Sequence, residues 1–161
     1  MSTVTVTHFI EAPAVDLWRV LVDLPVRVDW LTTVGGVELL TPGPLTLGTA
    51  WRETRTRPDG GAQAEEFLVV EAVPCRRLVL ASPGVGVTYR TTWTLRTVQR
   101  RRRPCTAVTV RQEAVATAPY GRVLALLFGG LAARAVEFAF HRDLADLARA
   151  VVDPQAVAEA A

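Results

Sequence analysis

The stretch that decides the fold is YGRVLALLFGGLAARAVEFAFHRDLADLARAVV, residues 120–152, which contains no proline. Its apolar residues recur at helical spacing, and Phe140, Leu144 and Leu147 mark the stripe that faces a core. We therefore predict one long C-terminal helix, about 50 Å in length if it is unbroken. The pair Gly129–Gly130 is where we expect it to kink.

The residues before this helix alternate between apolar and polar over short runs, and turns rich in proline and glycine separate the runs. This pattern is typical of antiparallel strands. An N-terminal strand at Thr3–Glu11 is followed by a helix at Pro13–Leu24 and a short helix at Val26–Leu31. Further strands are predicted at Val37–Leu40, Gly48–Arg57, Ala64–Val73, Leu78–Ser82, Val87–Val98 and Ala107–Ala116.

The composition limits the classes of protein and of partner. A length of 161 residues suits a single domain, which we place at 1–152 with a flexible tail at 153–161. All 18 basic residues are arginine, but the formal net charge of +2 gives no basic field for nucleic acid. No apolar run reaches the ~20 residues of a membrane span, and no signal peptide is visible, so we expect a cytoplasmic protein.

No sequence motif for a cofactor is present. The chain shows neither a phosphate loop nor a dinucleotide fingerprint. Cys75 and Cys105 lack the spacing of metal ligands, and we interpret them as free thiols. We therefore expect no cofactor and no metal.

The order of elements resembles the START-like helix-grip superfamily (SRPBCC), in particular its bacterial polyketide cyclase/dehydratase group. The residues that carry the resemblance are Ile10–Trp18, Trp30, Leu47–Glu53, Val73–Leu78 and Asp143–Leu147. The resemblance implies an α+β fold in which a curved antiparallel sheet wraps around the C-terminal helix and leaves a cavity. It also implies cyclisation, dehydration or aromatisation of a hydrophobic or polyketide-type intermediate of secondary metabolism. The alternative is a non-catalytic carrier of a lipid-like or drug-like ligand.

Two acidic residues of the central hairpin suggest chemistry in that cavity. If Pro58–Gly61 form the turn, Glu53 faces Glu66 across the strand pair, and Arg55 projects to the same side. Carboxylates placed opposite each other repel, so one of them is pushed toward protonation. We predict that Glu53 and Glu66 trade protons while Arg55 polarises a carbonyl. One alternative is that the hairpin projects beyond the cavity, with both acids solvated and Arg55 neutralising them. Another is that a register shift of one residue places the acids outside the cavity.

Aromatic and polar residues on neighbouring strands are candidates for the cavity wall. Tyr89 and Trp93 share one strand face, and Gln112 lies on the matching face of the next strand. His8 is a candidate base on the first strand, with a hydrogen-bonded core histidine as the alternative, and we expect His141 to be solvated. The predicted ligand-binding residues are Trp30, Trp51, Tyr89, Trp93, Gln112 and His8. For Trp30 and Trp93 the alternative is that the ring fills the core.

Two further segments point to protein partners. Arg100, Arg101, Arg102 and Arg103 form the densest charge in the chain and are candidates to contact an acidic carrier protein. The alternative is a solvated hairpin tip that keeps a sheet edge from aggregating. The segment Val123–Phe140 is apolar nearly all round, which suggests a homodimer.

Overall fold

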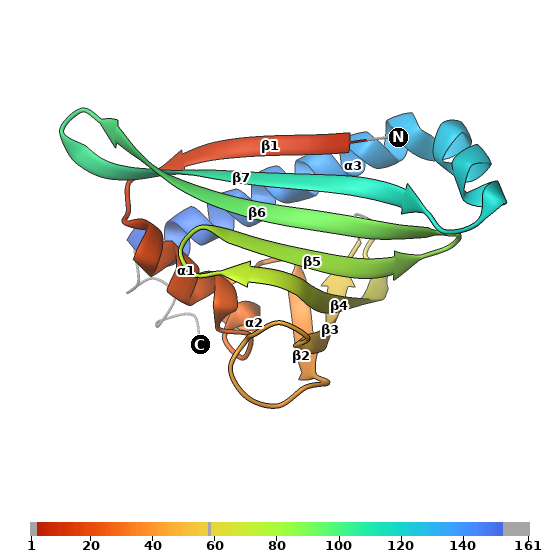
Figure 1. Ribbon diagram of the computed structural model, residues 1–161, viewed down its shortest axis with the longest axis horizontal. Coiled ribbons are helices and arrows are strands. Elements are labelled where there is room, and N and C mark those ends of the chain that lie inside the picture. Colours follow the sequence, from red (N-terminus) through yellow and green to blue (C-terminus); the bar gives the residue numbers. More distant parts are fainter. Residues whose placement is uncertain (1–2, 58, 153–161) are drawn as a thin grey trace.

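A computed structural model describes residues 3–57 and 59–152, with side chains inside the last helix described from residue 132 onward and at its first two residues. Within these residues the chain forms seven strands and three helices (Figure 1). In chain order they are β1 (Thr3–Ile10), α1 (Ala14–Val22), α2 (Arg27–Trp30), β2 (Val34–Leu39), β3 (Ala50–Thr56), β4 (Ala62–Val73), β5 (Arg77–Gly84), β6 (Val87–Arg100), β7 (Arg103–Ala116) and α3 (Pro119–Val152).

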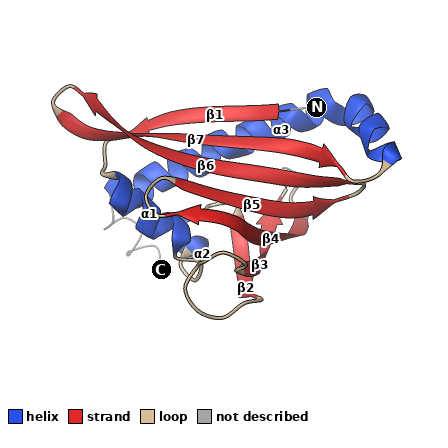
Figure 2. Ribbon diagram, viewed as in Figure 1, coloured by secondary structure: helices blue, strands red, loops and turns tan. Residues whose placement is uncertain are grey.

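The strands form one antiparallel sheet in the order β1-β7-β6-β5-β4-β3-β2. Consecutive strands are neighbours, except that β1 lies beside β7. Figure 1 shows β2 and β3 crossing the direction of β5, β6 and β7, so the sheet curves around α3. Figure 2 shows α3 along one face of the sheet, with α1 and α2 at one end. This arrangement is the helix-grip fold, and the fold prediction is confirmed.

The last hairpin is longer than predicted. Pairing between β6 and β7 continues to Arg100 and Arg103, whereas the prediction ended the first strand at Val98 and began the second at Ala107. The arginine run lacks the alternation of apolar and polar residues that marks a strand. The prediction therefore missed that β6 and β7 continue past the rest of the sheet. The domain boundary at residue 152 stays a prediction, because residues 153–161 lie outside the described residues.

The core lies between the C-terminal half of α3 and the inner face of the sheet. Leu144 and Leu147 are completely buried, and Phe140 is nearly so, which confirms the predicted stripe. They pack in one cluster with side chains of the inner sheet face, including Trp93 and Val108. Each large side chain of this kind contributes roughly 1.5–3 kcal/mol when it is buried. This half of the interior is therefore filled by the protein itself.

The N-terminal part of α3 bears on two further predictions. The dimer prediction rested on Val123–Phe140, and the side chains of residues 123–131, the first half of that segment, lie outside the described residues. Phe138, in its described part, is well exposed. None of the helices within residues 3–57 and 59–152 combines the length and apolar character that a membrane span requires.

Candidate functional site

The register of the β3–β4 hairpin differs from the predicted register by one residue. The last pair of the ladder is Thr56–Ala62, and the Arg57 backbone N–H donates to the Gly61 carbonyl at 2.7 Å, so Gly61 lies opposite Arg57. As a result, Glu53 lies opposite Glu65 rather than Glu66. Because strand side chains alternate between faces, this shift moves Glu66 to the other side of the sheet.

Glu66 lies on the outer face, where it pairs with Arg52. The Arg52 guanidinium donates to the Glu66 carboxylate at 2.6 and 3.2 Å, and both side chains are exposed. The predicted carboxylate pair of Glu53 and Glu66 is therefore wrong. The Glu66 carboxylate is solvated and paired with Arg52. Its side chain lies on the outer face and does not reach the interior.

Glu53 is fully buried and is saturated with donors. Its Oε1 accepts from Arg27 Nε and, at 2.8 Å, from Trp51 Nε1, while its Oε2 accepts from Arg55 Nε at 3.1 Å. Burial opposes the charged form, but the guanidinium groups of Arg27 and Arg55 outweigh it and lower the pKa of Glu53. Glu53 is thus held as a carboxylate and is poorly suited to carry a proton.

Arg55 connects β3 to α3. Its Nη1 donates to both carboxylate oxygens of Asp143, at 3.1 and 3.4 Å. Burial works against the Arg55 charge, but Asp143 and Glu53 outweigh it and raise the Arg55 pKa. Burial raises the pKa of Asp143, and Arg55 only partly offsets that effect. The guanidinium therefore stays charged and is fixed in place by two carboxylates.

The loop between α2 and β2 is also tied to α3 by carboxylates. The backbone N–H and the hydroxyl of Thr32 donate to Asp146 Oδ2 at 2.9 and 2.8 Å. Thr33 Oγ1 donates to Asp143 Oδ1 at 3.4 Å. These contacts hold α2, and with it Arg27, against the buried end of the sheet.

Glu65, rather than Glu66 as predicted, lies opposite Glu53 on the inner face. Its side chain is half-buried, and it has no salt bridge among the described residues. Burial raises the pKa of Glu65, Glu53 and Asp143 raise it further, and Arg55 opposes them. Glu65 therefore keeps a proton more readily than an ordinary exposed glutamate does.

The two tryptophans nearest Glu53 belong to the core. Trp30 and Trp51 are 5% and 1% exposed, and the Arg27 guanidinium lies over both rings at 5.7 and 5.6 Å. Trp51 also stacks on Phe67. Trp30 Nε1 is buried without a hydrogen-bond partner within the described residues. Both rings pack against the Arg27 guanidinium. Direct contact of either ring with a ligand stays a prediction.

The inner face of the sheet carries Tyr89, Trp93 and Gln112. As predicted, Tyr89 and Trp93 share one face of β6, and Gln112 lies on the matching face of β7. Trp93 pairs with Val110 and is buried in the core. Gln112 Nε2 donates to Thr91 Oγ1 at 3.2 Å. Tyr89 remains 38% exposed, so the inner face becomes more open toward this end of the sheet.

His8 points to the inner face, as its alternation predicted, and meets α3. Its Nε2 lies 2.9 Å from His141 Nδ1, a hydrogen bond that the sequence prediction missed. Burial and the nearby His141 lower the pKa of His8. His141 itself is exposed, as expected, but it is paired rather than simply solvated.

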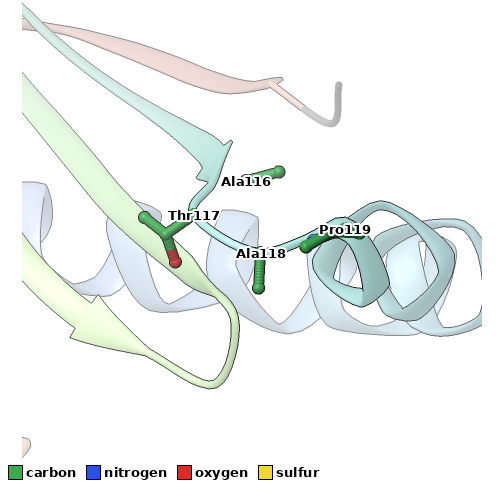
Figure 3. Close-up of a pocket in the computed structure, with 4 residues that line it drawn as sticks. All are labelled: Ala116, Thr117, Ala118 and Pro119. Atoms are coloured by element: carbon green, nitrogen blue, oxygen red, sulfur yellow. The ribbon is translucent and has the colours of Figure 1, made fainter.

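A shallow pocket, largely open to solvent, lies where β7 leads into α3 (Figure 3). It has a volume of about 420 Å³, and the residues lining it are Ala116, Thr117, Ala118 and Pro119. Ala116 pairs with Val87, and Val87 pairs with Gly84. The pairing between β4 and β5 ends at Leu68 and Ala81, before it reaches Glu65. Glu65 lies on the inner face, opposite Glu53.

The described residues offer no evident metal centre. In the part of the chain that the structure describes, no three His, Cys, Asp or Glu side chains come together as metal ligands. Cys75 and Cys105 are both free.

Comparison with known proteins places this site in context. The family described as "Polyketide cyclase / dehydrase and lipid transport" matches residues 1–152. Among solved structures, TTHA0849 from Thermus thermophilus is similar at 19% identity and a TM-score of 0.68, over 95% of this chain and 99% of that one. No curated protein matches the sequence closely enough to count as a relative.

Two similar structures come from biosynthetic pathways. The di-domain ARO/CYC StfQ of the steffimycin pathway shares 15% identity at a TM-score of 0.69, over 96% of this chain and 52% of StfQ. DynU16, from the dynemicin biosynthetic locus, shares 18% identity at a TM-score of 0.65, over 98% of this chain and 49% of DynU16. The chain thus spans about half of each. At these identities the likeness establishes a shared fold.

Proposed function

Because the chain belongs to the polyketide cyclase / dehydrase and lipid transport family, we propose that it binds a hydrophobic, polyketide-type molecule and catalyses its cyclisation or dehydration. The ligand would lie against the open end of the inner face, between Tyr89, Gln112 and the pocket rim. The observation that carries the catalytic part is Glu65, an inward carboxyl group with a raised pKa and no cation of its own among the described residues.

Glu65 has the properties of a group that both takes and returns a proton. In a dehydration, its carboxylate removes a proton from the carbon next to a carbonyl. The C=C bond forms as the C–O bond to the neighbouring hydroxyl breaks, and the proton on Glu65 passes to the departing oxygen to form water. A raised pKa brings the proton affinity of the carboxylate closer to the working pH, which favours both transfers.

Arg55 is the candidate to stabilise the negative charge that develops on the carbonyl oxygen. Its Nε and Nη1 are bound to Glu53 and Asp143, while none of the described residues accepts a hydrogen bond from Nη2. A guanidinium held by two carboxylates needs little reorganisation during the reaction. In this proposal Glu53 is a positioning residue, which acts by holding Arg55.

The test compares two neighbouring glutamates that face opposite sides of the sheet. Glu65→Gln and Glu66→Gln are each assayed with a synthetic linear poly-β-ketone that carries one β-hydroxyl group, with binding followed by tryptophan fluorescence and product by mass spectrometry. We expect Glu65→Gln to bind the probe normally and to lose about 10²–10⁴-fold in turnover, the usual contribution of acid–base catalysis. Glu66→Gln should match the wild type. Full turnover by Glu65→Gln would refute the catalytic assignment.

A carrier without catalysis is the second candidate function. The family description includes lipid transport, and each buried carboxylate that contacts Arg27 or Arg55 is already neutralised. In this case Ala116→Trp, which fills the pocket, should abolish binding of the polyketone and of a fatty acid alike. Thr5→Trp, on the exposed outer face of β1, is the matched control. Wild-type binding with no product would favour the carrier.

A further inference from the structure

The tip of the β6–β7 hairpin projects beyond the rest of the sheet (Figure 1). On one side, β5 pairs with β6 only as far as Thr94, after which Leu95 N donates to the Arg76 carbonyl. On the other side, β1 pairs with β7 only as far as Thr106. Residues 96–105 therefore form a two-stranded ribbon, and we refer to it as the arginine ribbon.

The β6 side of the arginine ribbon is an open strand edge. Leu95 N–H points toward β5, and alternation along a strand directs the backbone groups of Thr97 and Gln99 the same way. No described strand lies there to pair with them. The edge therefore presents a short row of backbone donors and acceptors of the kind that an added strand uses.

The ribbon carries a strong positive charge, which is only partly compensated by acidic side chains of the described residues. Five arginines and no acidic residue lie between residues 95 and 106. Arg100 is stacked over the Phe9 ring at 4.5 Å, and Arg103 lies 3.6 Å from Glu11. The other three have no salt bridge among the described residues, so their guanidinium groups are available to a partner.

The turn of the ribbon keeps two arginines where they are conformationally unfavourable. Arg101 and Arg102 have φ angles of 49° and 62°, in the left-handed region. A two-residue hairpin turn of this kind favours Asn-Gly, because a side chain with a bulky Cβ substituent is strained there. Protection of an edge from aggregation needs charge along the strand and does not require it at the strained turn. The strain therefore points to a role for these side chains in recognition.

We propose that the arginine ribbon docks an extended acidic segment of a partner protein by strand addition. The partner's backbone would pair with Thr97 and Gln99, and its carboxylates would lie across from Arg96 on the outer face and beside Arg101 and Arg102 at the tip. An open row of backbone groups fits a peptide better than a membrane surface or a nucleic acid, because neither of those offers an ordered row of complementary amides.

The docking site lies far from the pocket. The ribbon tip and the pocket rim stand at opposite ends of the 14-residue strand β7. At 3.3 Å per residue these ends are roughly 40 Å apart. A partner held at the ribbon therefore leaves the pocket open, so the contact locates the protein in an assembly and does not depend on the proposed reaction.

The first experiment measures binding of a fluorescein-labelled peptide of alternating glutamate and valine to the intact chain. We expect binding that weakens at least tenfold when alternate peptide nitrogens are methylated, because methylation removes the donors of a strand ladder. Arg96→Thr should weaken it by a similar factor. The comparison ligands are vesicles with phosphatidylserine and a random-sequence DNA duplex.

The second experiment uses a variant that should fold better than the wild type. Arg101→Asn with Arg102→Gly relieves the turn, and we expect a midpoint of unfolding about 4–8 °C higher together with weaker peptide binding. The proposal would be overturned if the affinity for the peptide were unchanged by methylation of the peptide or by substitution of the arginines. It would also be overturned by tighter binding to the vesicles or to DNA, or by a relieved turn that binds the peptide as well as the wild type.

Discussion

Substitution of Glu53 by glutamine is the sharpest test of the buried charge network. The change keeps the shape of the side chain and removes one negative charge. Oε1 could still accept from Trp51, but the new amide group would face Arg27 or Arg55 with donors of its own. Two buried guanidinium groups would then share Asp143 as their remaining carboxylate of the network.

The size of the effect follows from the burial of the pair. Glu53 is 0% exposed and Arg27 is 5% exposed. Removal of one partner from a buried pair costs about 3–5 kcal/mol, because it leaves an uncompensated charge. For a domain of this length, each 1 kcal/mol lowers the midpoint by about 2–4 °C, so Glu53→Gln should lose roughly 6–20 °C. Glu66→Gln breaks only an exposed pair, worth about 0–1 kcal/mol.

The assay is urea and thermal unfolding followed by circular dichroism for both variants. The lowered pKa of Glu53 means that its stabilisation is complete above the unfolded-state pKa of about 4.3 and is lost as the pH falls below it. The gap between wild type and Glu53→Gln should therefore narrow in acid. A loss of stability no larger than that of Glu66→Gln would refute the network as described.

Three further outcomes are expected. Because the pKa of His8 is lowered from 6.5, the folded state favours the neutral imidazole. The midpoint of thermal unfolding should therefore fall as the pH drops below about 6.5. In a series of melts at different pH values, His8→Gln should show a smaller fall than the wild type. Because the pKa of Glu65 is raised, its charge opposes folding at neutral pH; Glu65→Gln should raise the midpoint at pH 7, and that gain should vanish below about pH 4. Leu144→Ala should cost about 2–5 kcal/mol in urea unfolding, whereas truncation of the exposed Phe138 should cost less than about 1 kcal/mol; equal losses would contradict the assigned core.

The fold could be predicted because its signals are local. Alternation at period two identifies β1, β6 and β7 within a few residues of their bounds, and helical spacing identifies the stripe of α3. The facing positions of Tyr89 and Ala114, or of Trp93 and Val110, follow from the same alternation once the hairpin is recognised. No long-range information is needed for any of these.

The site could be predicted only in part, because its contacts are not local. Arg55 and Asp143 are separated by 88 residues and His8 and His141 by 133. A single sequence gives no indication that these residues contact each other. An aspartate beside the buried stripe of α3 does indicate that a cation lies close to it. The Glu66 error has a different origin. The turn Pro58–Gly61 allowed a loop longer by one residue, and a shift of one reverses the face of every side chain.

That shift decides which carboxyl group has chemistry to do. The interior cluster holds two guanidinium groups, Arg27 and Arg55, and three carboxyl groups, Glu53, Glu65 and Asp143. Two charges of each sign balance, so the third carboxylate would leave a net negative charge in a partly dry site, which is unfavourable. Glu53 and Asp143 hold the direct contacts with the guanidinium groups, and Glu65 has no such contact among the described residues. Burial is the main cause of the raised pKa of Glu65, and the negative charges of Glu53 and Asp143 raise it further. Loss of the Glu53 charge should therefore lower the pKa of Glu65.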